Sequence, residues 1–415
     1  MKQYVIIGNG VAATGCVEGI RSADSEGKIT VISGENRPVY CRPLISYYLE
    51  GKATPEKMNY RSEGFAEKMN CEFFYGKQAV QLRQDDKTVV LDDGTVLPYD
   101  EVCIATGSVP FVPPFAGLDT VEKQFSFMTM DDALALDAAV NKDSRVLIVG
   151  AGLIGLKCAE GLHGRVASIT VCDLADRVLS SILDTQSAAV MQQHLEENGI
   201  HLLLGDTVSQ FEKNVASMRS GAEVEFDVLV LAVGVKANTA LARQAGAEVN
   251  RGILVNEKME TTVPGIFAAG DCTEGMDASL GQRRVLAILP NAYLQGRCAG
   301  INMAGGNAVH DRAIPMNSLG LLGLHAMTAG TAFSEADGGS MVEEKSEVGW
   351  KRFFVKDGLL TGFMLLGDVD RAGIYTALIR EKTPLDSIDF AVLKKSPTLA
   401  AMPKENRRKK LGGVV

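Results

Sequence analysis

The chain has 415 residues, more than one hydrophobic core normally organises, so we expect about three domains. Hydrophobic residues make up 46% of the chain and charged residues 22%, a balance that excludes a largely disordered protein. The net charge of −9 argues against nucleic acid as a general partner. No apolar run approaches membrane-spanning length, and the first predicted strand begins at Lys2. We therefore expect a soluble cytoplasmic protein without a signal peptide.

The eight cysteines and five histidines show none of the short spacings typical of metal sites or local redox disulfides. Neither a C-x-x-C nor a C-x-x-x-x-C pair occurs in the sequence. We expect no protein-bound metal.

A glycine-rich turn follows the first predicted strand. The apolar run 4–7 leads into Gly8-Asn9-Gly10-Val11-Ala12-Ala13, which is followed by a predicted helix over 11–21 and a strand over 28–32. The amides of such a loop and the helix N-terminus bind a pyrophosphate. Glu35 comes just after the second strand, where a carboxylate can accept hydrogen bonds from a ribose diol. These features predict a dinucleotide site.

The same pattern recurs in the middle of the chain. The apolar run 146–149 precedes Gly150-Ala151-Gly152-Leu153-Ile154-Gly155, and the next predicted strand, over 169–172, is followed by Asp173. A carboxylate at that place binds the adenosine ribose hydroxyls and repels a 2′-phosphate, so we expect NADH to be preferred over NADPH. A predicted helix over 185–198 and a closing run over 228–234 complete this unit.

The remaining segments assign the chain to the α/β class. We predict two Rossmann-like dinucleotide-binding domains and a C-terminal α/β domain, which contains a hairpin around Lys356-Asp357-Gly358. The first domain is discontinuous, covering 1–108 and 236–312, and the second covers 109–235, beginning with a proline-rich linker. The third covers 313–415 and ends in a basic tail, Lys404 to Lys410, which we expect to be mobile.

Five motifs occur in the order found in the pyridine nucleotide-disulfide oxidoreductases, and the chain resembles that family over about three quarters of its length. They are the two glycine loops, Ala105-Thr106-Gly107, Gly270-Asp271 and Tyr40-Cys41-Arg42-Pro43-Leu44-Ile45-Ser46. The last motif is similar to that of NADH-rubredoxin reductases, ferredoxin reductases of oxygenase systems, apoptosis-inducing factor and the flavin part of nitrite reductases.

The resemblance implies FAD in the first domain and NAD in the second. In these relatives the Arg-Pro-x-x-Ser element lies along the flavin, and the aspartate of Gly-Asp binds the ribityl chain. The residues that the resemblance assigns to FAD are Gly8, Gly10, Val11, Ala12, Ala13, Glu35, Arg42, Pro43, Ser46, Val80, Ala105, Thr106, Gly107, Gly270, Asp271, Pro290 and Asn291. Those that it assigns to NAD are Gly150, Gly152, Leu153, Ile154, Gly155, Asp173 and Gly234.

The chain departs from the family pattern near the expected flavin. Relatives often pair a glutamate after the second loop with a lysine after the Arg-Pro-x-x-Ser serine, and this chain has Lys157 and Tyr47 at those places. Either both are tolerated substitutions, or Lys157 supplies the cation from the other side of the site. Leu153 stands where relatives have an aromatic lid, which indicates a less gated nicotinamide pocket.

Together these features predict an FAD-dependent NADH:acceptor oxidoreductase. Electrons would pass, in either direction, between NAD(H) and a one-electron iron-sulfur acceptor such as rubredoxin, ferredoxin or a partner subunit. One alternative is an NADH oxidase or coenzyme A-disulfide reductase that uses Cys41 as a thiol relay. Another is a non-catalytic redox-sensing or scaffold flavoprotein. A homodimer and a subunit of a larger redox complex both stay open.

The electron acceptor is expected to dock on the domain after Ala313, since the other two domains hold the cofactors. Its candidate surface is a basic cluster, although a solvated tail is the competing interpretation. The cluster consists of Lys394, Lys395, Arg407, Arg408, Lys409 and Lys410.

Overall fold

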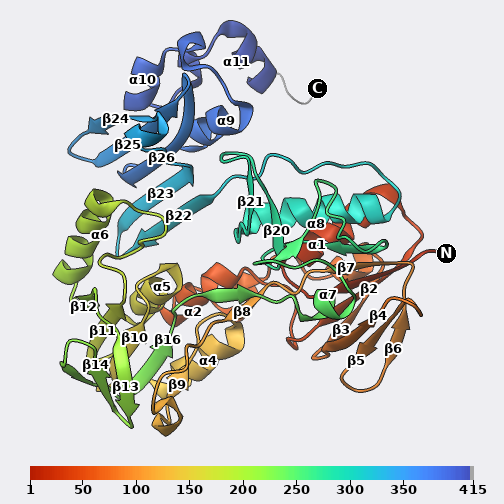
Figure 1. The fold of residues 1–415 in the computed structure, drawn as a ribbon, viewed down its shortest axis with the longest axis horizontal. Helices are drawn as coiled ribbons and strands as arrows, with labels where there is room; N and C mark the ends of the chain where they lie inside the picture. Colours follow the sequence, from red (N-terminus) through yellow and green to blue (C-terminus); the bar gives the residue numbers. More distant parts are fainter. Residues whose placement is uncertain (412–415) are drawn as a thin grey trace. The chain divides into compact units, whose positions relative to one another are not determined.

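The computed structural model describes residues 1–411, apart from the side chains of 406 and 409–411. Its contacts divide the chain into two compact units (Figure 1). The first contains Met1–Asp176, Gly199–Met276 and Arg283–Asp311. The second contains Arg177–Asn198, Asp277–Gln282 and the chain from Arg312 onward. The predicted α/β class is confirmed.

A five-stranded parallel sheet, in the order β19-β7-β1-β2-β3, forms the centre of the first domain. Its inner strands are almost entirely apolar, as expected for a parallel sheet that is covered on both faces. The strands are β1 (Gln3–Ile7), β2 (Lys28–Ser33), β3 (Cys71–Tyr75), β7 (Glu101–Ile104) and β19 (Ile266–Ala268). Helix α1 (Val11–Ala23) connects β1 to β2, as the sequence predicts.

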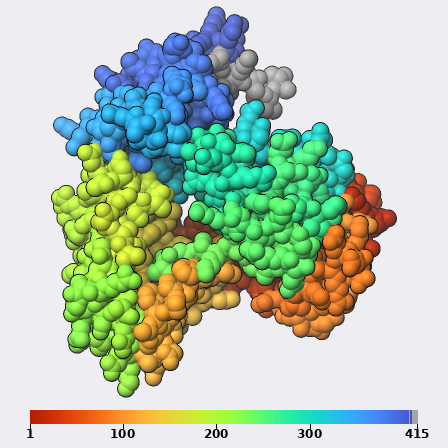
Figure 2. Space-filling model, viewed as in Figure 1, coloured from red at the N-terminus to blue at the C-terminus, as the bar shows by residue number. Residues whose placement is uncertain are grey.

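Smaller elements surround this sheet. An antiparallel sheet of β4 (Ala79–Arg83), β5 (Thr88–Leu91) and β6 (Val96–Pro98) lies at the surface of the first domain, orange in Figure 2. The other elements are α2 (Ile45–Leu49), α3 (Phe65–Lys68), α7 (Ala240–Gln244), α8 (Leu289–Met303), β18 (Ile253–Leu254), β20 (Thr273–Asp277) and β21 (Gln282–Arg284).

A second five-stranded parallel sheet, in the order β12-β11-β10-β16-β9, contains the second glycine loop. Its strands are β9 (Gln124–Phe125), β10 (Arg145–Val149), β11 (Ser168–Asp173), β12 (Ile200–Leu204) and β16 (Val228–Leu231). Helices α4 (Met130–Ala139) and α5 (Leu153–Leu162) and the antiparallel strands β13 (Val208–Glu212), β14 (Val215–Met218) and β15 (Glu223–Glu225) accompany it. The two crossings between the domains pair as β8 (Ser108–Pro110) and β17 (Val235–Ala237), so the predicted linker begins as a strand.

The second unit is built on an antiparallel sheet in the order β22-β23-β26-β25-β24. Its strands are β22 (Met316–Leu321), β23 (Leu324–Gly330), β24 (Ser340–Lys345), β25 (Gly349–Lys356) and β26 (Leu359–Gly367), and its helices are α6 (Thr185–Glu197), α9 (Gly373–Glu381), α10 (Phe390–Lys395) and α11 (Lys404–Leu411). The predicted hairpin around Asp357 is confirmed by the pairing of β25 with β26. The basic tail, Lys404 to Lys410, lies on helix α11.

Helix α6 belongs to the second unit by its contacts, although we predicted it within the NAD domain. The buried guanidinium of Arg352 binds Asp184, the N-cap residue of α6. Near the other end of the helix, His194 Nε2 lies 3.1 Å from the carbonyl oxygens of both Leu321 and Leu322. The helix is therefore attached to the antiparallel sheet at both ends. Within residues 1–411, no helix is long and apolar enough to cross a bilayer.

Helices α1 and α8 pack backbone to backbone through glycines spaced four residues apart on each helix (Figure 1). A Cβ added at Gly15 or Gly19 would lie 2.3 Å from the carbonyl oxygen of Tyr293 or Arg297, respectively. A Cβ added at Gly296 would lie 1.9 Å from the carbonyl oxygen of Ala12, and one at Gly300 would lie 2.1 Å from that of Cys16. Only glycine allows this separation, because the clashing atoms belong to the backbone.

We predict that Gly296→Ala destabilises the protein by about 2 kcal/mol or more, because α8 must move away from α1 to admit the methyl group. The midpoint of urea unfolding measures this loss. The control is Gly373→Ala at the start of α9, where an added Cβ has no atom within 4 Å. Equal midpoints for the two variants would show that the helix contact tolerates a side chain.

Candidate functional site

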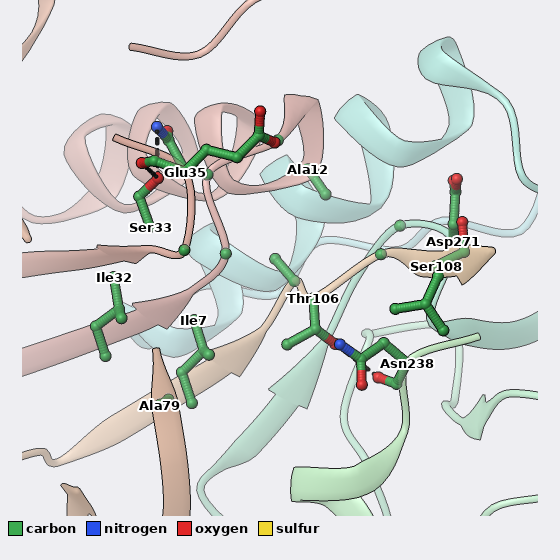
Figure 3. Close-up of a pocket in the computed structure, with 18 of the residues that line it drawn as sticks. Ile7, Ala12, Ile32, Ser33, Glu35, Ala79, Thr106, Ser108, Asn238 and Asp271 are labelled. Carbon is green, nitrogen blue, oxygen red and sulfur yellow. Dashed lines mark hydrogen bonds between the residues drawn. The ribbon is translucent and has the colours of Figure 1, made fainter. Parts of the chain in front are cut away.

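A cavity of about 650 Å³ opens in the first unit at the carboxyl ends of its parallel strands (Figure 3). The segments that follow β1, β2, β7 and β19 all contribute to its wall, and the start of α4 and residues of α7 and α8 complete it. This is the edge at which open α/β sheets bind ligands. The volume lies within the range of cofactor sites.

The first glycine loop leaves room for a phosphate in this wall. Gly8 has φ of +118°, and a Cβ there would lie 2.1 Å from the carbonyl oxygen of Ala105. Gly10, which precedes the first residue of α1, has no atom within 4 Å of an added Cβ and no side-chain cap. The loop therefore presents backbone amides and a helix N-terminus to the cavity, which suits an anionic pyrophosphate.

Glu35 is held by two neighbours from its own loop. Arg42 Nη2 donates to one carboxylate oxygen at 2.5 Å, and the Tyr40 hydroxyl donates to the other at 2.8 Å. The Tyr40 hydroxyl accepts a hydrogen bond from the Met130 amide at 2.8 Å, and Arg42 Nη1 donates to the Met128 carbonyl at 3.0 Å. Burial raises the pKa of Tyr40, so the hydroxyl keeps its proton. The loop is thereby fixed to the start of α4.

Asp271 lies in the cavity wall opposite this loop (Figure 3). Desolvation raises the pKa of its carboxyl group, and the positive charge of Arg42 acts in the opposite direction. On the same side of the cavity, the Thr106 hydroxyl donates to the Asn238 carbonyl oxygen at 2.7 Å. The cavity thus offers a carboxylate and polar groups at the end away from Glu35.

Most residues expected to bind FAD line this cavity, and a minority do not. Those in its wall are Gly8, Gly10, Val11, Ala12, Glu35, Arg42, Val80, Ala105, Thr106, Gly107, Gly270 and Asp271. Those outside the wall are Ala13, Pro43, Ser46, Pro290 and Asn291. Ser46 is buried and donates to the Pro43 carbonyl at 3.2 Å, and buried Asn291 donates to the Leu286 carbonyl at 3.1 Å.

The cavity also contains residues that the sequence analysis missed. These are chiefly Arg37, Tyr40, Lys77, Gln78, Met128, Thr129, Asn238, Ala240, Leu241 and Gln244. Tyr40 and Arg37 had a signal in the sequence, since Tyr40 begins the motif that contains Arg42 and Pro43, and Arg37 lies three residues before it. Of the others, Lys77 and Gln78 lie between β3 and β4, and the rest lie just before α4 or at α7. No local pattern marks them.

The second glycine loop repeats the geometry of the first. Gly150 has φ of +119°, and an added Cβ would lie 2.3 Å from the Ala232 carbonyl oxygen. A Cβ at Gly155 would lie 1.9 Å from the Gly150 carbonyl oxygen, whereas at Gly152 it would have no atom within 4 Å. Leu153 and Ile154 begin α5 directly after the loop, and Gly234 follows the adjacent strand β16 with φ of +129°. The loop fits a second pyrophosphate.

Asp173 ends strand β11 beside this loop, as predicted. Its carboxylate accepts hydrogen bonds from the Ala151 amide at 2.7 Å and from the Ala175 amide at 2.8 Å. The Asp173 side chain is therefore fixed next to the phosphate loop.

Lys157 lies on α5 and contacts α2. Its ammonium binds the carboxylate of Glu160 and lies 4.8 Å from the centre of the Tyr47 ring. The Lys157 side chain is 20% exposed and that of Glu160 is 9% exposed. Lys157 and Tyr47 therefore face each other.

Cys41 is half-buried and lies outside the cavity wall. Desolvation raises the pKa of its thiol, which disfavours the reactive thiolate. This environment does not favour the alternative in which Cys41 relays electrons.

Comparisons with known proteins agree with the two-loop geometry. A family model described as pyridine nucleotide-disulphide oxidoreductase matches residues 2–296. The chain is 31% identical over 392 residues to the NADH-dependent phenylglyoxylate dehydrogenase subunit epsilon of Aromatoleum evansii, covering 92% of each chain. It is 33% identical over 312 residues to the nitric oxide reductase FlRd-NAD(+) reductase of Salmonella gallinarum, covering 74% of this chain and 80% of the relative. The reductase in the covalent putidaredoxin reductase-putidaredoxin complex has the same fold, with a TM-score of 0.87 at 24% identity, covering 96% of this chain and 99% of that one.

We predict that Gly8→Ala abolishes stoichiometric flavin binding, because the methyl group collides with the Ala105 carbonyl oxygen and distorts the loop. The ratio of flavin to protein absorbance after purification measures the effect. Gly94→Ala is the control: Gly94 also has positive φ, of +86°, but an added Cβ there has no atom within 4 Å. Full flavin content in Gly8→Ala would contradict a phosphate site at this loop.

Proposed function

The chain belongs to the pyridine nucleotide-disulphide oxidoreductase family, and we propose that it passes electrons between NAD(H) and a one-electron iron-sulfur protein or subunit. It is an NAD(P)H-dependent flavoprotein oxidoreductase whose cofactors are FAD and NAD(H). FAD supplies the chemistry, since it takes up electrons in pairs and releases them singly. The protein binds and orients the cofactors.

This proposal rests mainly on one observation: the described part of the chain has two dinucleotide-binding loops but no cysteine suited to relay electrons. All eight cysteines are free among the described residues, and only Cys41 and Cys71 are not fully buried. Desolvation raises the pKa of Cys41 and raises that of Cys71 to about 11. Without a reactive thiol, electrons leave the flavin directly for the acceptor.

The residues around the cavity favour one orientation of FAD. We propose that the first glycine loop binds the pyrophosphate, that Glu35 receives the adenosine ribose, and that Asp271 faces the ribityl chain. Arg42 binds Glu35, so we assign its guanidinium to the ribose and phosphate end of FAD. The second loop and Asp173 would hold NADH in the same way.

A protein acceptor is favoured over a small substrate by one relative. The Aromatoleum protein is named as a subunit of a dehydrogenase, and this chain matches it over 92% of its length. We therefore propose that this chain also works with a protein partner that carries the iron-sulfur group.

We predict that Asp173→Asn narrows the preference for NADH over NADPH by about tenfold or more, because a like charge no longer faces the 2′-phosphate. The ratio of kcat/KM values for flavin reduction by the two nucleotides measures it. Asp206→Asn is the control, since Asp206 lies near the end of β11 but binds the Thr207 and Ser220 amides. Equal use of NADH and NADPH by the unaltered protein would refute the assignment.

The basic cluster of the C-terminal domain lies on two helices. Lys394 and Lys395 are in the last turn of α10, and Lys394 lies 3.5 Å from Glu344. Arg407 and Arg408 lie on α11, whereas the side chains of Lys409 and Lys410 are outside the described residues. We propose this cluster as the docking surface for an acidic acceptor, because charge complementarity speeds association.

We predict that truncation before Lys404 leaves NADH-to-dye activity intact but slows transfer to the protein acceptor, with a deficit that shrinks as salt rises. The core residue Met402 remains in the truncated chain, so the domain should still fold. The double substitution Arg407→Gln and Arg408→Gln should give a smaller deficit of the same kind. Unchanged transfer at low salt would mean that docking occurs elsewhere.

A further inference from the structure

Helices α2 and α5 form a close junction between the FAD domain and the NAD domain. Helix α2 follows Arg42 of the cavity wall within a few residues, and α5 begins at the second glycine loop. A Cβ added at Gly161 of α5 would lie 2.9 Å from Leu49 Cβ and 3.1 Å from the Ser46 carbonyl oxygen. The two helices are therefore in contact.

Polar groups brace the same junction. Arg165, which follows α5, donates to the Leu49 carbonyl oxygen and binds Asp137 of α4 at 2.6 Å. The Tyr48 hydroxyl donates to the other Asp137 oxygen at 3.2 Å. Helix α2 is thus fixed to both α4 and α5.

The junction matters because hydride transfer requires the two reacting atoms to approach within about 3–3.5 Å. One dinucleotide extends from the loop before α1 and the other from the loop before α5. Their reactive rings must meet where the two domains adjoin, and α2 and α5 pack there. A charge held close to the rings in this junction would act on them.

The charge in question is the Lys157 ammonium. Lys157 and Glu160 are three residues apart on α5, so both project toward one side of the helix. The nearly buried Glu160 carboxylate would be costly without a cation, and Lys157 supplies it. The ammonium also contacts the Tyr47 ring of α2. The Lys157 nitrogen lies 4.8 Å from the centre of that ring.

We infer that Glu160 is a positioning residue, which holds the Lys157 ammonium in the junction so that its charge favours the reduced flavin. This inference rests on the proposed function, since it takes FAD and NAD(H) to bind at the two loops. A nearby cation stabilises a group that gains negative charge. A lysine that no longer binds Glu160 is held less firmly in the junction, so its charge acts more weakly on the flavin.

The test is the midpoint potential of the protein-bound flavin, measured by electrochemical titration without NADH or acceptor. We expect Lys157→Gln to lower the ratio of reduced to oxidised flavin about tenfold at a fixed applied potential, or about 30 mV for a two-electron couple. Glu160→Gln should lower the ratio as well, by several-fold, because it releases the lysine. In the Lys157→Gln background, Glu160→Gln should no longer lower it.

If only the charge of Glu160 mattered, its removal would shift the flavin potential in the opposite direction. If Glu160 acts only as a buried anion, removing it raises the potential in both backgrounds, and the inference is overturned. It is equally overturned by an unchanged potential in Glu160→Gln, or by equal decreases with and without Lys157.

Two further variants keep the test decisive. Glu50→Gln is the matched control. Glu50 is also in this junction and its side chain is only 11% exposed, but it pairs with Lys52 at 3.0 Å. The midpoint potential of the flavin should therefore not change in this variant. If Glu160→Gln does not fold, Glu160→Asp keeps the charge on a shorter side chain and should give a smaller decrease that again requires Lys157. A flavin that NADH cannot reduce would refute the proposed function, while the potentials would still test the role of Glu160.

Discussion

The backbone contact between α1 and α8 is the constraint on which the FAD cavity depends. Gly296 admits the Ala12 carbonyl, and Gly15 admits that of Tyr293, so the helices approach more closely than side chains would allow. Helix α1 carries the phosphate loop, and Ala292 at the start of α8 lines the same cavity. Segments distant in the sequence are thereby packed into one wall of the cavity.

A polar network connects the loop around Glu35 to the segment before α4, and both line the cavity. Tyr40 and Arg42 bind Glu35 from one side and the main chain of residues 128–130 from the other. A single loop therefore serves the cofactor and fixes the start of α4 at the same time. The electrostatic balance of the cavity and the contact between the two dinucleotide domains are consequently not independent.

The parts of the fold that the sequence predicts are those with strong local signals. Both strand–loop–helix units and the hairpin around Asp357 appear where period and turn residues place them, because tight turns require glycine and buried parallel strands require apolar runs. The lining residues Asn238 and Thr129 had no such signal, since they reach the cavity only through tertiary packing. The contacts of α6 with the antiparallel sheet had no local signal either, because Arg352, distant in the sequence, binds its N-cap residue Asp184. Ser46 matches a motif yet is buried away from the cavity, because its hydroxyl serves the turn that begins α2.

The discontinuity of the first domain has a consequence for biosynthesis. Strand β19 and helix α8 lie far along the chain, at Ile266–Ala268 and Leu289–Met303, yet α8 and the segment after β19 contribute to the same cavity wall as the loop at Gly8. A ribosome-bound nascent chain that has not yet exposed Met303 has synthesised the phosphate loop and lacks its supporting helix. Capture of the flavin is therefore a late event, which follows emergence of the whole NAD domain, and the long-range contacts involved make it a slow one. Until then the apolar faces of α1 and β7 remain uncovered, and this interval is when the growing polypeptide most needs protection from aggregation.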